Sequence, residues 1–182
     1  AYRALYLDHI LKEGPGITYY RDQLFKSMVR AVKTVEDSDE PVPARFEAIL
    51  REYQKTGFRW MKTLDKCGFG GILADDMGLG KTIQVIALFE DTYSSGEKAP
   101  SLVVCPASLV YNWEQEIQKF APDLKVRSVV GTGPQRLELL EKIKEDPSGC
   151  QILITSYDLL KRDIAHYEGI DFRFQIIDEA QY

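Results

Sequence analysis

The fold is decided by the stretch GGILADDMGLGKT, residues 70–82. Its apolar start predicts a short strand at residues 70–74, and the apolar positions after residue 82 predict a helix. Between them, Gly78 and Gly80 let the backbone turn tightly and approach a ligand, because glycine has no Cβ. A helix N-terminus adds free N–H groups and the positive end of the helix dipole, so this turn is suited to an anion.

The polar residues of the turn have the spacing that a bound triphosphate needs. Lys81 is placed to reach the outer phosphates, and Thr82 is placed to put a hydroxyl on Mg²⁺. The strict pattern G-x-x-x-x-G-K-[ST] has glycine where this chain has Asp75. On these residues alone, a glycine-rich turn that only joins a strand to a helix is the alternative interpretation.

Composition excludes several classes of protein. The chain has 182 residues, of which 45% are hydrophobic and 28% are charged, as in an ordinary globular protein with its own core. Its net charge of −5 confines any nucleic-acid contact to a local patch. Cys67, Cys105 and Cys150 lack metal-ligand spacing, so we expect reduced, mostly buried thiols in a cytoplasmic protein. No apolar run is long enough to span a bilayer, and we expect no membrane partner.

The first part of the chain predicts helices. Residues 1–43 are expected to form a helical N-terminal extension that ends in an acidic, proline-bearing linker, with the domain boundary there. Residues 44–66 predict a helix with an apolar stripe at Tyr53, Gly57, Trp60, Met61 and Leu64. The basic residues of this segment are interpreted as a solvated helix face; they are Arg51, Lys55, Arg59, Lys62 and Lys66.

Strands and helices alternate in the rest of the chain. Short apolar runs predict strands at residues 101–106, 126–130, 151–155 and 172–177, with helices between them. This alternation predicts an α/β fold, with a parallel sheet that helices cover on both faces. Ser108 is expected to cap the helix after the first of these runs. Ligands bind beyond the carboxyl ends of strands in such sheets.

An acidic pair, Asp178 and Glu179, follows the last predicted strand. A magnesium ion bound to ATP needs hard oxygen ligands, which Asp178 beside Thr82 would supply. Glu179 is then the residue that polarises the attacking water, so Lys81, Asp178 and Glu179 are the predicted catalytic residues. Alone, the acidic pair is better interpreted as a solvated turn; together with the glycine-rich turn upstream, it favours a nucleotide site.

These stretches resemble motifs of the Swi/Snf family of helicase-related DNA translocases, in helicase superfamily two. Residues 75–82 are similar to motif I, where the family replaces the first glycine, and residues 178–181 are similar to motif II. Residues 50–57, 104–113 and 154–157 resemble the Q-motif, motif Ia and motif Ib. The resemblance implies a P-loop NTPase with a RecA-like parallel sheet, preceded by a small helical segment. It implies ATP and Mg²⁺ as cofactors, with nucleotide contacts from Gln54, Asp76, Met77, Gly78, Leu79, Gly80, Lys81, Thr82 and Gln181.

The resemblance also implies a function. Members are DNA-dependent ATP hydrolases that track along double-stranded DNA, and their phosphate contacts correspond to Ser108, Thr155 and Ser156 here. Helix capping is an equally strong interpretation of these three side chains. Gln181 and the leading helices favour a prokaryotic-type member, which would be associated with the nucleoid.

The end of the chain shapes the remaining expectations. Residues 44–182 are expected to form part of the first RecA-like lobe, because the chain begins without methionine and stops just after motif II. A later strand and the second RecA-like lobe of the parent protein would then be missing, so we expect little ATP turnover by this chain. The chain would then be only part of the folded object, or a neighbouring copy would fill the gap. The alternatives are a module without hydrolysis that recruits a protein partner through its N-terminal helices, and a DEAD-box RNA helicase, which Gln181 disfavours.

Overall fold

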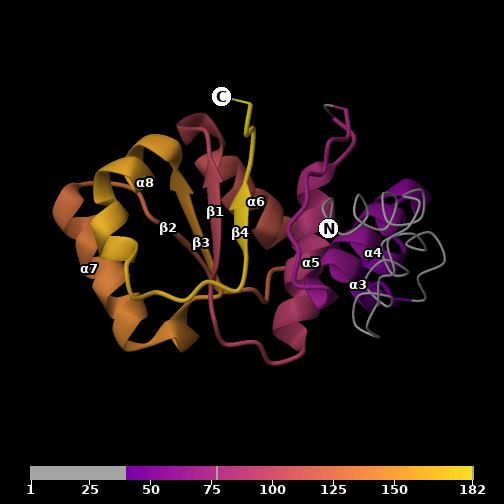
Figure 1. Cartoon of the computed structure of the whole chain (residues 1–182), viewed down its shortest axis with the longest axis horizontal. Helices are drawn as coiled ribbons and strands as arrows, with labels where there is room; N and C mark the ends of the chain where they lie inside the picture. Colours follow the sequence, from indigo (N-terminus) through magenta and orange to yellow (C-terminus); the bar gives the residue numbers. More distant parts are fainter. Residues whose placement is uncertain (1–39, 77, 182) are drawn as a thin grey trace, which may run out of the picture. The chain divides into compact units, whose positions relative to one another are not determined.

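The structure is a computed structural model, and it describes residues 40–76 and 78–181. The chain divides into two compact units, the first ending at Leu88 and the second beginning at Phe89, and each is described by itself (Figure 1). The predicted helices at residues 1–36, Met77 and all of the predicted linker before residue 40 lie outside the described residues. The domain boundary at residue 43 therefore stays a prediction.

Between residue 40 and the glycine-rich loop, the first unit contains two helices. These are α3 (Ala44–Glu47) and α4 (Glu52–Lys66), and α5 (Lys81–Ser94) begins after the loop and continues into the second unit. The prediction of one helix over residues 44–66 is wrong. A new helix begins after Arg51 because the side-chain oxygen of Gln54 accepts a hydrogen bond from the Arg51 N–H at 2.9 Å, which satisfies a free donor of the helix N-terminus.

The buried face of α4 differs from the predicted stripe. Phe58 is fully buried and Gln54 is nearly so, whereas Tyr53 is 40% exposed. The basic row is not a uniformly solvated face, because Lys55 is buried and its ammonium lies 2.7 Å from a Glu47 carboxylate oxygen. The hydrogen bond to Glu47 raises the pKa of Lys55, so this lysine stays charged within the fold.

The predicted strand at residues 70–74 does not form. This stretch is irregular, and the side chain of Ile72 is 85% exposed. A strand exists only where a neighbouring strand receives its ladder of hydrogen bonds, and the described part of the first unit contains no strand to pair with. The two glycines that begin the stretch also have low β-propensity.

The second unit is built on a parallel sheet with the order β2-β3-β1-β4. Val104 of β1 lies opposite Thr155 of β3 and Ile177 of β4. Four of the five expected strands are therefore confirmed. The elements are β1 (Ser101–Cys105), α6 (Val110–Phe120), β2 (Val126–Ser128), α7 (Gly133–Glu145), β3 (Ile152–Ser156), α8 (Tyr157–Asp163) and β4 (Gln175–Ile177).

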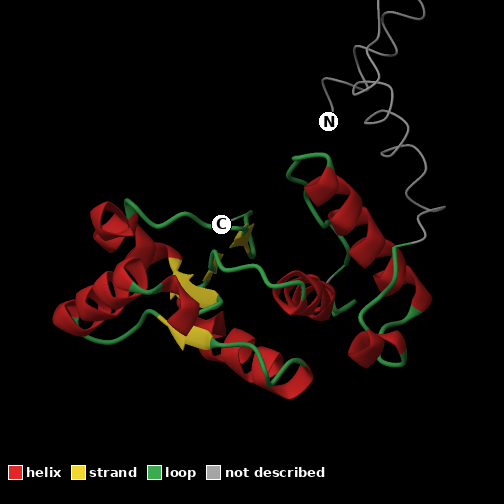
Figure 2. Cartoon of the chain, turned by 90° about the horizontal axis from the view of Figure 1, so that it is seen from below, coloured by secondary structure: helices red, strands yellow, loops and turns green. Residues whose placement is uncertain are grey.

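Helices cover both faces of this sheet, as predicted (Figure 2). The chain moves from β1 to the edge strand β2 through α6, and then returns in the opposite direction through α7 and α8. Right-handed crossovers place helices from opposite directions of travel on opposite faces. A core cluster fills the face of α7 and α8, where Leu140 packs with Leu102, Val104 and Leu153. On the other face, α6 packs against β2 and β3.

Two of the three cysteines, Cys105 and Cys150, are buried, as expected from the composition. All three cysteines are free, and burial raises the pKa of Cys105 and of Cys150 to about 12, so both behave as small apolar side chains. Among residues 40–76 and 78–181, no group of three or more His, Cys, Asp or Glu side chains is arranged to hold a metal ion. No helix in that part is long and apolar enough to cross a bilayer.

Candidate functional site

The glycine-rich loop is anchored by α4. The Tyr53 hydroxyl and the Gln54 side-chain amide both donate hydrogen bonds to the Leu79 carbonyl, at 3.0 and 2.9 Å. Gln54 also accepts from the Arg51 N–H, so one amide group both starts α4 and holds the loop. Its predicted contact with the nucleotide stays a prediction, but the structure places Gln54 directly against the loop that the sequence assigns to phosphates.

Two glycines give this loop a shape that other residues resist. Gly78 and Gly80 have φ of 82° and 74°, in the left-handed region that side chains disfavour. A Cβ on Gly80 would lie 2.5 Å from the Gln54 amide nitrogen, which is closer than such atoms approach. The loop then enters α5 at Lys81, so its backbone leads into a helix N-terminus of the kind that binds anions. These residues fit a bound phosphate.

Lys81 lies folded against its own loop. Its ammonium donates to the Asp75 carbonyl at 2.7 Å and to the Asp76 carbonyl at 3.2 Å. A phosphate would offer the same ammonium a charged partner, and charge-assisted hydrogen bonds are stronger than those to neutral carbonyls. Lys81 and Thr82, which sits in the first turn of α5, are both partly exposed.

The second unit fixes Asp178 immediately beyond β4, where the sequence predicts it. The Asp178 N–H donates to the Val104 carbonyl at 2.8 Å, which continues the pairing of β1 and β4. One carboxylate oxygen accepts from the indole N–H of Trp113 at 2.8 Å, and the other accepts from the Glu179 N–H at 3.0 Å. The Tyr157 hydroxyl donates to the Asp178 carbonyl at 2.5 Å. Backbone and side chain of Asp178 are thus both held.

Glu179 has a strained backbone. Its φ is 53°, and it is the only residue other than glycine with a positive φ in the described part of the chain. This conformation costs roughly 1–2 kcal/mol, and such strain is found preferentially at functional sites. The Glu179 carboxylate accepts a hydrogen bond from the Gln181 side-chain amide. Two residues that the sequence assigns to catalysis and nucleotide binding therefore contact each other.

The sequence assigned no role to Trp113 or Tyr157. The two residues were covered only by stretches that resemble motif Ia and motif Ib, but Trp113 is buried and its N–H therefore needs an acceptor. Burial and the nearby Asp178 charge raise the pKa of Tyr157, which keeps its hydroxyl protonated and able to donate. A polar aromatic residue near the carboxyl edge of a predicted sheet is the signal that would have identified them.

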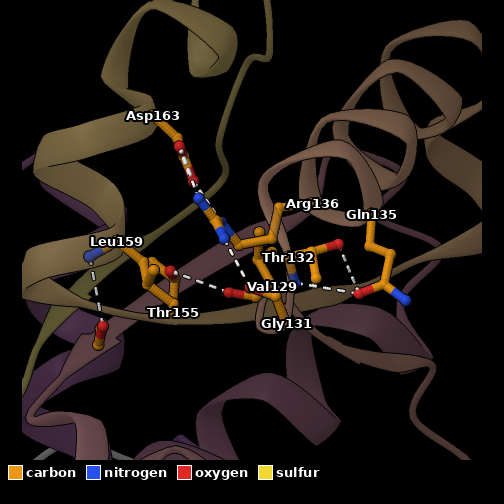
Figure 3. A network of polar contacts seen from close by, with 9 residues as sticks. Val129, Gly131, Thr132, Gln135, Arg136, Thr155, Leu159 and Asp163 are labelled. Carbon is orange, nitrogen blue, oxygen red and sulfur yellow. Dashed lines mark hydrogen bonds and ion pairs between the residues drawn. The ribbon is translucent and has the colours of Figure 1, made fainter.

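The three side chains predicted to contact DNA have different environments. The Ser156 hydroxyl accepts from the Leu159 N–H at 3.4 Å and caps α8. Thr155 is fully buried and donates to the Val129 carbonyl at 3.4 Å (Figure 3). Ser108 is exposed, but it does not cap α6 as predicted, because it lies inside the 3₁₀ turn at residues 107–109 that precedes the helix. Contact of these residues with DNA stays a prediction.

A buried ion pair joins α7 to α8. The Arg136 guanidinium donates two parallel hydrogen bonds to the Asp163 carboxylate, at 2.6 and 3.0 Å, and a third to the Gly131 carbonyl at 2.6 Å (Figure 3). Arg136 holds the pKa of Asp163 below its ordinary value. Nothing in the local sequence pattern predicts this pair.

The predicted site residues therefore form two groups. Gln54, Asp76, Gly78, Leu79, Gly80, Lys81 and Thr82 belong to the first unit, and Asp178, Glu179 and Gln181 belong to the second. Chemically, the first group can bind an anion, and the second presents a fixed carboxylate beside a strained glutamate. Joint coordination of Mg²⁺ by Thr82 and Asp178 stays a prediction.

Comparisons with known proteins point in one direction. A family model described as the SNF2-related domain matches residues 53–182. An uncharacterized ATP-dependent helicase of Mycoplasma genitalium is 45% identical over 133 residues, which are 72% of this chain and 12% of that protein. The chromatin-remodeling ATPase INO80 of Candida albicans is 40% identical over 151 residues, covering 78% of this chain and 11% of that protein.

A solved structure gives a similar result. The SWI2/SNF2 ATPase core of Sulfolobus solfataricus, in complex with double-stranded DNA, matches with a TM-score of 0.63 and 45% identity. The match covers 72% of this chain and 26% of that one. The chain thus spans only a small part of the proteins that it resembles.

Proposed function

The chain belongs to the SNF2-related domain family, and from that premise we propose that it forms the ATP-binding lobe of a motor that translocates on double-stranded DNA. Its parallel sheet with helices matches the SWI2/SNF2 ATPase core. The observation that carries the proposal is the glycine-rich loop, held at its Leu79 carbonyl by Gln54 and leading into α5 at Lys81.

Each residue of the loop has a defined task in this proposal. Gln54 binds the adenine edge, where an amide can donate and accept one hydrogen bond each. The backbone N–H groups of Gly78 and Gly80 surround the phosphates, and the ammonium of Lys81 leaves its loop carbonyls to neutralise the outer ones. Because Gln54 and the two glycines are already held in place before ATP arrives, only Lys81 has to change partners when it binds.

The turn after β4 supplies the remaining groups. Thr82 and Asp178 would hold Mg²⁺, which neutralises phosphate charge when bound. Trp113 and Tyr157 fix the position of Asp178, so its carboxylate needs little rearrangement. Glu179 orients and polarises a water for attack on the terminal phosphate. Hydrolysis also needs groups from the rest of the parent protein, so this chain alone turns over little ATP.

The proposal places DNA on the carboxyl edge of the sheet. Ser108 is exposed there and can donate to a backbone phosphate. The Sulfolobus relative was solved with double-stranded DNA, which supports duplex DNA as the partner. ATP hydrolysis by the full-length parent protein is expected to rise with duplex DNA and not with RNA; stimulation by RNA alone would contradict this assignment.

Binding of a fluorescent ATP analogue with Mg²⁺ tests the nucleotide site directly. Lys81→Ala is expected to weaken binding about 10- to 100-fold, because a hydrogen bond to a charged group contributes about 1.5–3 kcal/mol. Gln54→Ala is expected to weaken it as well, since it removes both the adenine contact and the anchor on Leu79. Lys142→Ala, on the exposed face of α7, serves as the matched control. Equal affinity of all four proteins would contradict the proposal.

A further inference from the structure

We propose that Gln84 is a positioning residue that holds the two ends of the glycine-rich loop together and so prepares the loop for phosphates. The inference concerns Asp75, Gly57 and Gln84, to which the sequence assigned no function. Its effect on nucleotide affinity rests on the function proposed above, whereas its effect on the loop itself does not.

The side-chain amide of Gln84 reaches both ends of the loop. Its nitrogen donates to an Asp75 carboxylate oxygen at 3.0 Å and to the Gly80 carbonyl at 3.3 Å. An amide nitrogen has two N–H groups, so both bonds can form at once. Asp75 begins the loop and Gly80 ends it, so the Gln84 side chain links the two ends of the loop.

The hydrogen bond from Gln84 gives the Asp75 side chain a structural role. The strict phosphate-loop pattern has glycine at this position, and glycine offers no side-chain acceptor. Here the carboxylate of Asp75 accepts the amide of Gln84. The charge makes this hydrogen bond stronger than one between neutral groups. Asp75 therefore supplies an acceptor that glycine would lack. We call the two hydrogen bonds from Gln84 to Asp75 and Gly80 the clamp.

The clamp differs from the contact that Lys81 makes with the same end of the loop. Lys81 is partly exposed, and a bound phosphate would draw its ammonium away from the Asp75 carbonyl. Gln84 is fully buried and does not face a ligand. Its bonds persist when Lys81 turns to the phosphates, so Gln84 maintains the closed loop in both states.

Gly57 provides the space that Gln84 occupies. It lies inside the 15-residue helix α4, where glycine is less favourable than any residue but proline. A Cβ there would lie 1.9 Å from the Gln84 side-chain oxygen, far inside the contact distance. That oxygen is buried and has no hydrogen-bond partner within the described residues, so the amide is held by its nitrogen and by shape. Glycine at position 57 is unfavourable in a helix, but it leaves the space that the Gln84 side chain occupies.

The first test uses the sign of a stability change. Gly57→Ala should lower the thermal midpoint of the natural chain, because the new methyl group displaces Gln84. In a Gln84→Ala background the same change should raise the midpoint, because alanine is the better helix former. Gly133→Ala, whose Cβ would meet nothing within 4 Å, is the matched control and should shift both backgrounds alike. A Gly57→Ala shift of the same sign in both backgrounds would overturn the proposal.

The second test measures the loop and its ligand separately. Gln84→Ala should speed amide hydrogen exchange at residues 78–80 and weaken the ATP analogue about tenfold, the range of a hydrogen bond to a charged group. Asp75→Leu should do the same, whereas Asp75→Asn, which keeps an acceptor oxygen, should retain most of both properties. Gln118→Ala, on the exposed face of α6, should change neither.

The outcomes separate the two proposals. If the natural chain fails to bind the analogue, the proposed function is wrong, and exchange at residues 78–80 still decides the clamp. If the chain binds and Gln84→Ala leaves both exchange and affinity unchanged, the clamp is wrong. Faster exchange with unchanged affinity would also overturn the positioning role, because a loop prepared for phosphates must bind them more tightly when it is closed.

Discussion

The loop at residues 75–80 and the turn at residues 178–181 are held by opposite means. Side chains hold the loop, since Tyr53, Gln54, Lys81 and Gln84 all donate hydrogen bonds into it. The turn is held by the sheet, because the Asp178 N–H continues the ladder between β1 and β4. Trp113 and Tyr157 then add two further donors to the same residue.

The difference teaches how each region can respond to a ligand. At least one donor of the loop, Lys81, has a neutral carbonyl as its partner, and a phosphate competes well for it. The loop can therefore exchange internal bonds for bonds to a ligand. The carboxylate of Asp178 is positioned by a strand ladder and a buried ring, so it is fixed before any ligand binds. The loop at residues 75–80 can therefore rearrange around a ligand, whereas the turn at residues 178–181 is rigid.

The largest expected effect is a loss of stability in the second unit, which carries the rigid turn at residues 178–181. Asp163→Ala leaves the buried Arg136 guanidinium without its carboxylate, and loss of one partner from a buried pair costs about 3–5 kcal/mol. Urea unfolding followed by circular dichroism measures the loss. Glu138→Ala removes the carboxylate of an exposed pair with Lys142 and should leave the free energy of unfolding unchanged. Equal effects of the two changes would contradict a rigid second unit built on this pair.

A smaller effect is expected at Trp113. Trp113→Phe keeps a buried aromatic ring but removes the N–H that Asp178 accepts, which should cost about 1.5–3 kcal/mol. The same unfolding experiment applies, with Trp60→Phe in the first unit as the control. A loss at Trp113 no greater than that at Trp60 would mean that the indole N–H does not hold the carboxylate.

A change of pH tests the Arg136–Asp163 pair without removing the carboxyl group. Arg136 lowers the pKa of Asp163 in the folded state, so the pair stabilises the fold fully above the ordinary carboxyl pKa of about 3.9. This stabilisation is lost as the pH falls through the lower folded-state pKa. The free energies of unfolding of the natural chain and of Asp163→Asn should differ by a constant amount between pH 7 and pH 5 and converge below about pH 4. Convergence already above pH 5 would contradict the assigned direction of the shift.

Elements that carry a clear apolar run in their own sequence could be predicted. The apolar runs at residues 101–106, 126–130, 151–155 and 172–177 coincide with the four strands of the sheet. The strand at residues 70–74 could not be judged in this way, because a strand depends on a partner that the local pattern does not contain. Tyr53 was expected on the buried stripe of α4 but is 40% exposed, whereas Gln54 is nearly buried. Both donate to the Leu79 carbonyl, a contact about 25 residues along the chain that the local pattern does not contain.

The residues of the candidate site could be proposed from the sequence, but the side chains that hold them in position could not. Lys81 and the two glycines were singled out by their spacing in the turn. Asp178 needed the glycine-rich turn upstream before it could be interpreted as more than a solvated turn. Trp113 lies 65 residues from Asp178, and Arg136 lies 27 residues from Asp163, so no local pattern links them. Gln84 is unusual in the sequence as a glutamine within an apolar helical run. Its role could be recognised only in the structure, where Gly57 lies against its side chain.

The central claim, that the loop binds phosphates, is tested most directly by glycine-selective ¹⁵N labelling. The chain has 13 glycines, and each can give one amide signal in a nitrogen–proton spectrum. Titration with ATP and Mg²⁺ should shift the signals of Gly78 and Gly80 saturably and leave those of Gly96 and Gly149 in place. Gly78 and Gly80 signals that stay unchanged at saturating ATP, or equal shifts at all four glycines, would contradict the account.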